Sequence, residues 1–253
     1  MRGLKVIQQH KKLKILLVGD SCTDIYQFGK VDRISPEAPV PIFVPSYTEE
    51  KGGMADNVRN NLESLGAVVD YYSGYAGTKT RLIDERTGHQ IARIDSDEQA
   101  VTPNIVLEND WDAIVVSDYN KGTVDYSLID KLRSLQIPTF VDTKKTNLKN
   151  FKNCILKINE LEYSRRTSSG ETVVVTLGSR GATVIDNENS VHIESKDIGV
   201  VDVTGAGDTF LAALAIGFFE KENLLEAVDF ANRAAAETVK HLGVYAPSRD
   251  DIQ

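Results

Sequence analysis

Short apolar runs alternate with amphipathic segments along most of the chain. The run "KILLVGD" (14–20) ends in Gly-Asp and predicts a buried strand that delivers Asp20 to the carboxyl edge of a sheet. The next periodic segment, 54–65, has apolar residues three or four positions apart and is followed by Gly66, as is typical of a helix that ends there. The pattern therefore predicts a strand, an excursion and a helix, in that order.

Similar patterns continue toward the C-terminus. Further apolar runs predict strands at 68–73, 80–84, 90–95, 113–117, 138–142, 154–158 and 172–177. A helical pattern at 128–135 lies between two of these strands, and residues 207–242 predict two long helices separated near Asn223. Continuous apolar strands that alternate with amphipathic helices are typical of a parallel sheet covered on both faces, so we expect an α/β fold.

The segment 25–51 differs from its surroundings because it is rich in proline ("SPEAPVPIFVP") and alternates only weakly. We interpret it as a small exposed β-flap; the alternative is an edge strand that its prolines protect from further pairing. The sequence has no internal repeat and no flexible linker, and α/β folds of this size commonly form one domain. We therefore expect a single domain over 1–253, with 25–51 as an excursion from it.

Composition narrows the function. Hydrophobic residues make up 41% of the sequence and charged residues 26%, as in ordinary globular proteins. The net charge of -8 argues against nucleic-acid binding, which needs a basic surface. Cys22 and Cys154 have neither metal-type nor disulfide-type spacing, so we expect reduced thiols and a cytoplasmic location. The apolar run 15–18 is too short to span a membrane, and we expect no membrane association.

The strongest chemical signal is the segment "DVTGAGDTF" (202–210). Gly205, Ala206 and Gly207 can converge backbone N–H groups at the start of a helix, where the helix dipole also favours an anion. Asp208 follows at once, and its charge would repel a phosphate that was merely bound there. A carboxylate in this position makes sense as a general base that takes a hydroxyl proton during phosphoryl transfer. The alternative is that Asp208 only favours its own helix N-terminus.

Polar residues end several of the predicted strands, namely Asp20, Asp118, Asp142 and Asn159. Ligands of an open parallel sheet bind beyond the carboxyl ends of its strands. We therefore expect these four residues to share a rim around the ligand site.

Six segments occur in the order found in the ribokinase-like, or PfkB, carbohydrate kinases. They are "GDSCTD" (19–24), "KGGMADN" (51–57), "SDYNKG" (117–122), "INELE" (158–162), "VTLGSRG" (175–181) and "DVTGAGD" (202–208). The segments "RISPEAPVPI" (33–42) and "FANRAAAETVKHLG" (230–243), together with "SDYNKG", further resemble the kinase domains of D-glycero-D-manno-heptose 7-phosphate kinases. The resemblance covers nearly the whole chain. It implies a ribokinase-like parallel-sheet core flanked by helices, with a small β-flap lid, and transfer of the ATP γ-phosphoryl group to O1 of the heptose 7-phosphate.

The resemblance also implies roles for individual residues. Asp208 would be the base, and the backbone of Gly205, Ala206 and Gly207 the anion hole. The residues implied to bind the sugar are Asp20, Asp24, Gly52, Gly53 and Asn57. Those implied to bind the nucleotide are Asn159, Glu162, Thr176, Gly178, Gly181, Thr204 and Asn232. No direct metal ligand is implied: Mg²⁺ would be held through phosphates and water near Glu162. The family's flaps often pair between subunits, which implies a homodimer through the lid.

An acceptor that already carries a phosphate needs a cationic anchor, because the chain itself is acidic. Lys79, Arg81 and Arg93 are the candidates, with Arg81 the first choice. A solvated basic face explains these three residues equally well from charge pattern alone.

Simpler alternatives also stay open for the weaker segments of the resemblance. Gly52 and Gly53 could form only the turn before a helix, and Asp24 could be a surface loop residue. The segment "INELE" could be a solvated helix start, since acidic residues favour first turns.

The match has local departures. Only "GYAGT" stands where the heptose kinases have a helix-strand unit before the basic loop near Lys79, and "YSRRTSSGE" replaces one or two helices after Glu162. Asn57 lies one residue farther from the glycine pair than in those kinases, as in ribokinase. The chemistry is therefore better supported than the substrate, and the alternatives are a PfkB-type kinase for another sugar or a non-catalytic nucleotide-binding regulatory protein. A dinucleotide-dependent oxidoreductase is disfavoured because no G-x-G-x-x-G follows the first strand.

Overall fold

A mixed sheet runs through the part of the chain that the computed structural model describes, which is residues 12–252 except 107–109, 169, 188 and 197–198. Within these residues, ten strands follow the order β10-β9-β8-β7-β6-β5-β1-β3-β4, with β2 paired to β1 outside this row. The parallel strands are β1 (Lys14–Ile34), β3 (Val68–Asp84), β5 (Ala113–Asp118), β6 (Thr139–Thr143), β7 (Ile155–Asn159) and β8 (Thr172–Thr176). The predicted α/β fold with a largely parallel sheet is confirmed.

The first half of β1 shows why the sequences of these strands are continuous apolar runs. Ile15 and Leu17 belong to the core on one face of the sheet, and Leu16 and Val18 belong to the core on the other. Successive side chains of a strand point to opposite faces, so a sheet that helices cover on both sides needs an apolar residue at every position.

Helices cover both faces. One face carries α1 (Ala55–Ser64), α4 (Ala206–Lys221) and α5 (Leu224–Thr238), and the other carries α2 (Tyr126–Ser134) and the 3₁₀ turn η1 (Lys149–Phe151). The short helix α3 (Glu160–Arg165) follows β7, and the 3₁₀ turn η2 (Gly178–Arg180) follows β8. The predicted break near Asn223 is confirmed, since its side chain caps α5 by accepting from Leu225 N and Glu226 N. No helix among the described residues is both long enough and apolar enough to cross a membrane.

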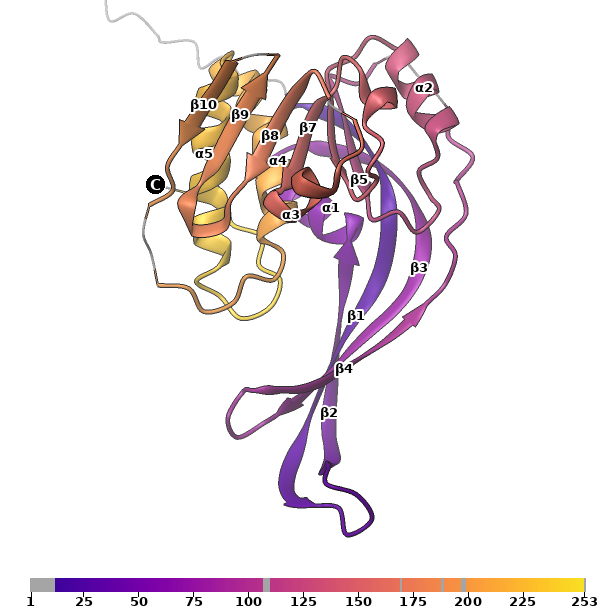
Figure 1. The fold of residues 1–253 in the computed structure, drawn as a ribbon, viewed down its shortest axis with the longest axis vertical. Helices are drawn as coiled ribbons and strands as arrows, with labels where there is room; N and C mark the ends of the chain where they lie inside the picture. Colours follow the sequence, from indigo (N-terminus) through magenta and orange to yellow (C-terminus); the bar gives the residue numbers. More distant parts are fainter. Residues whose placement is uncertain (1–11, 107–109, 169, 188, 197–198, 253) are drawn as a thin grey trace, which may run out of the picture.

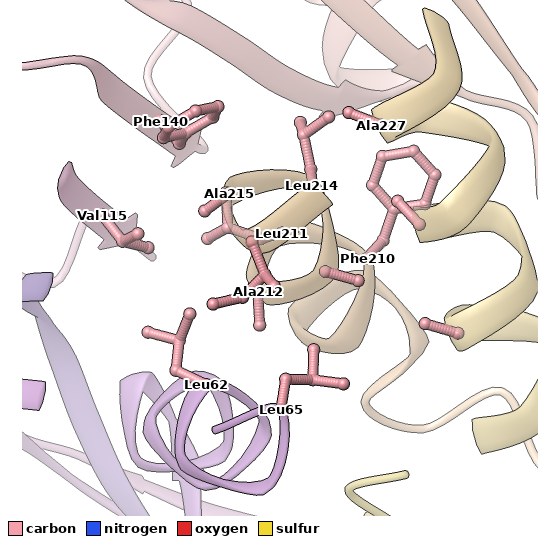
Figure 2. Packing of buried hydrophobic residues seen from close by; sticks show 14 of the residues in the cluster. Leu62, Leu65, Val115, Phe140, Phe210, Leu211, Ala212, Leu214, Ala215 and Ala227 are labelled. Carbon is pink, nitrogen blue, oxygen red and sulfur yellow. The ribbon is translucent and has the colours of Figure 1, made fainter. Parts of the chain in front are cut away.

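Helix α4 occupies the centre of its face. Figure 2 shows Leu211 and Ala215 on the side of the sheet residues Val115 and Phe140, with Leu62 of α1 alongside. Residues 208–217 of α4 are all buried, as expected of a helix with neighbours around most of its circumference. The N-terminus of α4 is therefore held in a fixed position at the carboxyl edge of the sheet.

An antiparallel hairpin extends one edge of the sheet. It consists of β9 (Ala182–Asp186), which pairs with β8, and β10 (Asn189–Ile193). Neither strand was predicted from the apolar pattern, because β10 is mostly exposed and its residues alternate without a strong apolar run.

The flap is larger than the sequence predicts. Strands β1 and β3 continue beyond the helical body, where β2 (Pro41–Met54) and β4 (Gln90–Asp97) pair with them antiparallel. Figure 1 shows these four strands projecting away from the helices. The predicted β-flap in 25–51 is present as part of the hairpin of β1 and β2, but the strands expected at 68–73 and 80–84 are parts of one strand, because β3 passes from core to flap without a break.

Candidate active site

The N-terminus of α4 carries free backbone donors. Gly205 is its N-cap, with φ 81° in the left-handed region that favours glycine. Among the described residues, the N–H groups of Gly205, Gly207 and Asp208 have no hydrogen-bond acceptor. The predicted contribution of Ala206 needs revision, because its N–H donates to Val203 O at 3.3 Å. Three free amides at the positive end of a helix dipole suit an anion.

Asp208 lies in the first turn of α4 and is 6% exposed. Its carboxylate accepts two hydrogen bonds, at Oδ2 from Asn57 Nδ2 and at Oδ1 from Tyr119 OH, each 2.9 Å long. Burial raises the pKa of Asp208 to about 6, and the two hydrogen bonds oppose part of that rise. The group is thus ionised at neutral pH and still basic enough to take a proton, as a general base requires.

Several residues predicted to bind the sugar gather between this carboxylate and the flap. Asn57, in α1, contacts Asp208 directly. A Cβ atom at Gly53 would lie 2.2 Å from Asp24 Oδ2, so only glycine lets that carboxylate approach. A Cβ atom at Gly52 would lie 2.6 Å from a side-chain carbon in the first turn of α1. The glycine pair therefore has a packing reason in addition to its predicted contact with a ligand.

Asp20 lies deeper than a sugar-binding residue was expected to lie. It is fully buried, and its two oxygens accept hydrogen bonds of 3.1 Å from Lys121 N and Thr123 N. These bonds hold the loop that follows β5, which also carries Tyr119. The structure gives Asp20 a positioning role for that loop, and its contact with a sugar stays a prediction.

A cavity lies beside the N-terminus of α4. Its lining includes Thr176, Gly178, Gly181 and Asn232, all predicted to bind nucleotide, together with Ala206 and Gly207 of the glycine-rich turn. Apolar residues form much of the remaining wall: Val200, Val203, Phe210, Ala235, Ala236 and Val239. An apolar cavity that ends at free amides suits a ligand with a flat base at one end and phosphates at the other.

Three other residues predicted to bind nucleotide lie outside that lining. Asn159 Oδ1 accepts from Glu162 N at 2.8 Å, and Glu162 Oε2 accepts from Asn159 N at 2.9 Å, which makes a capping box for α3. Glu162 Oε1 accepts from Lys144 Nζ at 2.7 Å. Thr204 donates through both N and Oγ1 to Asp202. Each of the three has a local structural role, and its contact with a nucleotide stays a prediction.

The described residues near Glu162 are compatible with a magnesium ion that is held mainly by substrate phosphates and water. The described residues contain no cluster of three or more His, Cys, Asp or Glu side chains that could hold a metal. Both oxygens of Glu162 already accept hydrogen bonds. Mg²⁺ usually keeps several waters and binds substrate phosphates with only one or two carboxylates, so the lack of such a cluster is compatible with the implied site near Glu162.

The three basic candidates differ in their surroundings. Arg81 Nη1 is 2.7 Å from Asp24 Oδ1, and both side chains are largely buried. Arg93 pairs with Asp95 and is half exposed. Lys79 forms no ion pair within the described residues, and its Nζ lies 5.4 Å from the centre of the Tyr119 ring. Asp24 thus neutralises the Arg81 guanidinium, and the role of any of the three residues as a phosphate anchor stays a prediction.

Two residues of the site received no role from the sequence. Tyr119 donates to Asp208, and burial raises the pKa of its phenol well above the ordinary value, so it stays a donor. Lys157 is 4% exposed, and its Nζ is 2.6 Å from Asp142 Oδ2. A signal was present, since Lys157 interrupts the apolar run "CILKI", and lysine is almost never buried unless it is paired.

Comparisons with solved structures agree with this architecture. Arabidopsis thaliana ribokinase, solved with ribose and ATP, superposes with a TM-score of 0.71 at 17% identity, covering 96% of this chain and 98% of the ribokinase. Phosphofructokinase-2 of Escherichia coli gives a TM-score of 0.72 at 19% identity, covering 96% and 97%. The fold is therefore ribokinase-like.

Sequence comparisons identify relatives along the chain. The bifunctional protein HldE of a Nitratiruptor species is 30% identical over 299 aligned positions, covering 96% of this chain and 64% of its own length. That of Campylobacter curvus is 32% identical, covering 96% and 65%. The chain thus spans slightly less than two thirds of the length of these proteins. The family described as pfkB family carbohydrate kinase matches residues 127–251, which include the glycine-rich turn and Asp208. Together with the fold, these matches show that the chain belongs to the pfkB family of carbohydrate kinases.

Proposed function

We propose that this chain transfers the γ-phosphoryl group of ATP to a hydroxyl of a sugar phosphate, specifically to O1 of D-glycero-D-manno-heptose 7-phosphate. The observation that carries the proposal is the position of Asp208 between the free amides of α4 and the residues below the flap. A protein that only binds a nucleotide gains nothing from a carboxylate next to its anion site, since the charge repels the ligand. A kinase needs such a group to accept the hydroxyl proton.

The transfer divides the site into two sides. The nucleotide lies in the cavity lined by Phe210 and Asn232, with its phosphates at the start of α4. The sugar lies near Asp24 and Asn57, below the flap. The acceptor oxygen attacks the γ-phosphorus, the bond from that phosphorus to the bridging oxygen breaks, and ADP leaves with the bonding electrons while Asp208 takes the hydroxyl proton. Mg²⁺, when bound, neutralises charge on the ATP phosphates.

A phosphorylated acceptor is supported by the charges on one face of the flap. Asp24 pairs in register with Lys51 on β2 and with Lys79 on β3, so the two lysines flank it on the same face. Neither lysine forms an ion pair within the described residues: Lys51 lies over the Tyr26 ring and Lys79 over the Tyr119 ring. Two unneutralised ammonium groups beside the sugar side suit a phosphate on the acceptor.

The choice of a heptose rests on resemblance. The segments "RISPEAPVPI", "SDYNKG" and "FANRAAAETVKHLG" are similar to heptose 7-phosphate kinases, and the relatives named above are HldE proteins. No physical feature of the site separates a heptose from a hexose. The missing helix-strand unit and the position of Asn57 favour the second candidate, a kinase for a smaller sugar.

ATP turnover against a panel of sugars and sugar phosphates tests the function. We expect ADP release that depends on heptose 7-phosphate and exceeds the rate with ribose, fructose or their phosphates. Faster turnover of a free sugar would reject the heptose and leave the kinase in place. ADP release that no acceptor stimulates would support a non-catalytic nucleotide-binding protein instead.

A matched pair of lysine variants tests the acceptor phosphate. Lys79→Met should raise the KM for the phosphorylated sugar about tenfold or more, because a charge-assisted contact is lost, and leave the KM for ATP unchanged. Lys30→Met is the control, since Lys30 lies on the same flap and is 62% exposed at a weak 3.8 Å pair with Glu85. Equal KM values for Lys79→Met and Lys30→Met would remove Lys79 from the acceptor site.

A homodimer through the flap completes the proposal. The flap exposes the large apolar side chains Ile34, Val40, Val44, Tyr47 and Ile94, each more than half exposed. A projecting sheet with this surface gains stability when a second copy covers it. Sedimentation of the intact protein should give twice the mass of one chain, and the double change Ile34→Lys and Val44→Lys should return it to one.

A further inference from the structure

Lys157 is a buried cation next to Gly207 of the proposed anion site. It stands on β7, paired in register with Asp142 on β6, and only 4% of its surface is exposed. Its Nζ donates to Asp142 Oδ2 at 2.6 Å. Removing an ammonium group from water costs free energy, so a lysine this deeply buried needs compensating anions.

The ammonium group has donors to spare. It carries three N–H bonds, and within the described residues Asp142 is its one hydrogen-bond acceptor. Burial disfavours its charge, yet the neighbouring carboxylates of Asp142, Asp208 and Glu162 raise its pKa above the ordinary value. Lys157 is therefore charged at neutral pH, and two of its N–H bonds are available to a ligand.

The group lies against the glycine-rich turn. A Cβ atom at Gly207 would be 2.9 Å from Lys157 Nζ, and among the described residues no other atom outside the helix would come within 4 Å of it. Gly207 does not have a positive φ, unlike Gly205, so its own backbone conformation does not call for glycine. The ammonium group instead gives the reason for glycine here, and Gly207 itself lines the cavity.

We propose that Lys157 is a further catalytic residue, whose ammonium group binds the oxygens of the γ-phosphoryl group at the start of α4. This inference rests on the proposed kinase function. As the acceptor oxygen bonds to phosphorus and ADP departs with the electrons of the broken bond, Lys157 keeps its proton and neutralises charge on the transferring group, while Asp208 takes the hydroxyl proton. Asp142 fixes the ammonium group in place.

The rival explanation is that Lys157 and Asp142 are only a buried structural pair. Three variants separate the two: Lys157→Met, Asp142→Asn, and the double variant that carries both changes. Breaking one side of a buried pair destabilises a protein, whereas removing both sides is far better tolerated. The double variant should therefore fold with a melting temperature close to that of the wild type, even where Lys157→Met alone does not fold.

Two measurements on the double variant decide the question. Turnover with ATP and the accepted sugar should stay about 10²-fold below that of the wild type, and Asp142→Asn alone should lose less. Binding of ATP with Mg²⁺, measured by calorimetry, should weaken about tenfold, while binding of ADP stays within twofold, because ADP lacks only the γ-phosphoryl group. Lys14→Met is the matched control, because Lys14 is also a lysine on a strand that pairs with aspartates. This substitution should change neither affinity.

A double variant that recovers wild-type turnover, or that loses the same factor for ATP and ADP, would overturn the inference and leave a structural pair. The binding arm keeps this result separate from the proposed function. If the wild type transfers no phosphate to any acceptor, the kinase proposal fails, yet the ratio of ATP to ADP affinity still shows whether Lys157 contacts the terminal phosphate.

Discussion

Asn57 donates a 2.9 Å hydrogen bond to Asp208 Oδ2, although the two residues are 151 positions apart in the sequence. Asn57 belongs to the helix that directly follows the flap, and Asp208 to the helix that begins at the glycine-rich turn. Both residues are buried, since Asn57 is 2% exposed and Asp208 is 6% exposed. The sugar side and the phosphate side of the site therefore meet at one carboxylate, and the donors to that carboxylate set its basicity.

Asn57→Ala should make Asp208 a weaker acid. The substitution removes a donor that stabilises the ionised carboxylate, so the acidic limb of kcat against pH should move up by about 0.5–1 pH unit from its position near pH 6. Tyr119→Phe removes the second donor and should move the limb in the same direction. A pH–rate profile from pH 5 to 9 measures both. An unchanged limb in both variants would show that it belongs to another group.

The same carboxylate should reduce stability at neutral pH. The pKa of Asp208 is about 6 in the folded chain against an ordinary 3.8, so the folded state binds more protons between these values, and the free energy of unfolding falls as pH rises through that window. Asp208→Asn removes the penalty and should stabilise the chain by about 3 kcal/mol at pH 7.5, at about 1.4 kcal/mol per pKa unit, and by much less at pH 4. Urea unfolding at both pH values tests the sign. A variant less stable than the wild type at pH 7.5 would contradict it.

Substitutions of the two glycines of the glycine-rich turn, Gly205 and Gly207, should impair the enzyme for different reasons. Gly205→Ala forces a side chain onto a φ of 81° and places Cβ 2.7 Å from Asn57 Nδ2, so it should disturb the base and lower kcat about tenfold or more. Gly207→Val should displace Lys157 and weaken ATP binding. Gly88→Ala is the control for positive φ alone, because no atom lies within 4 Å of its Cβ position.

Wild-type turnover in Gly205→Ala would show that the turn is not needed in this form. Loss of activity in Gly88→Ala would mean that the assay reports stability and not the site.

Many of the helices and strands could be predicted from the local sequence pattern. The features that could not be predicted depend on tertiary contacts between distant segments. The run ending in Asp20 predicts its strand, and Gly66 the end of α1, because both depend on neighbouring residues. That β1 continues from the core into the flap could not be read from the sequence, since flap residues are held by partners and not by an apolar pattern of their own. The register that places Lys51 and Lys79 on either side of Asp24 is equally non-local.

The candidate site likewise has features that consecutive residues predict and features that depend on the fold. The glycine-rich turn and Asp208 carry a local signal, because backbone geometry and a helix start are written in consecutive residues. The pairing of Arg81 with Asp24 and of Lys157 with Asp142 depends on which strands are neighbours, so charge pattern alone could predict neither pair.

Replacing flap residues 31–46 with Asn-Gly should affect the sugar and not the nucleotide. The removed tip consists of the end of β1, the start of β2 and the turn between them, and it leaves Asp24, Arg81, the core and the cavity in place. The KM for the sugar phosphate should rise about tenfold or more through lost closure over the ligand, and the KM for ATP should change less than twofold. Equal increases in both KM values would reject the lid.

Single-turnover phosphoryl transfer by Asp208→Asn tests the central claim most directly. Asparagine keeps the size of the side chain and an acceptor for the hydrogen bond from Asn57 or Tyr119, but it cannot take a proton at neutral pH. With enzyme in excess over ³²P-labelled ATP and saturating sugar phosphate, the account predicts unchanged ATP affinity and a transfer rate about 10²-fold or more below that of the wild type. A transfer rate within a few fold of the wild type would contradict the role of Asp208 as the base.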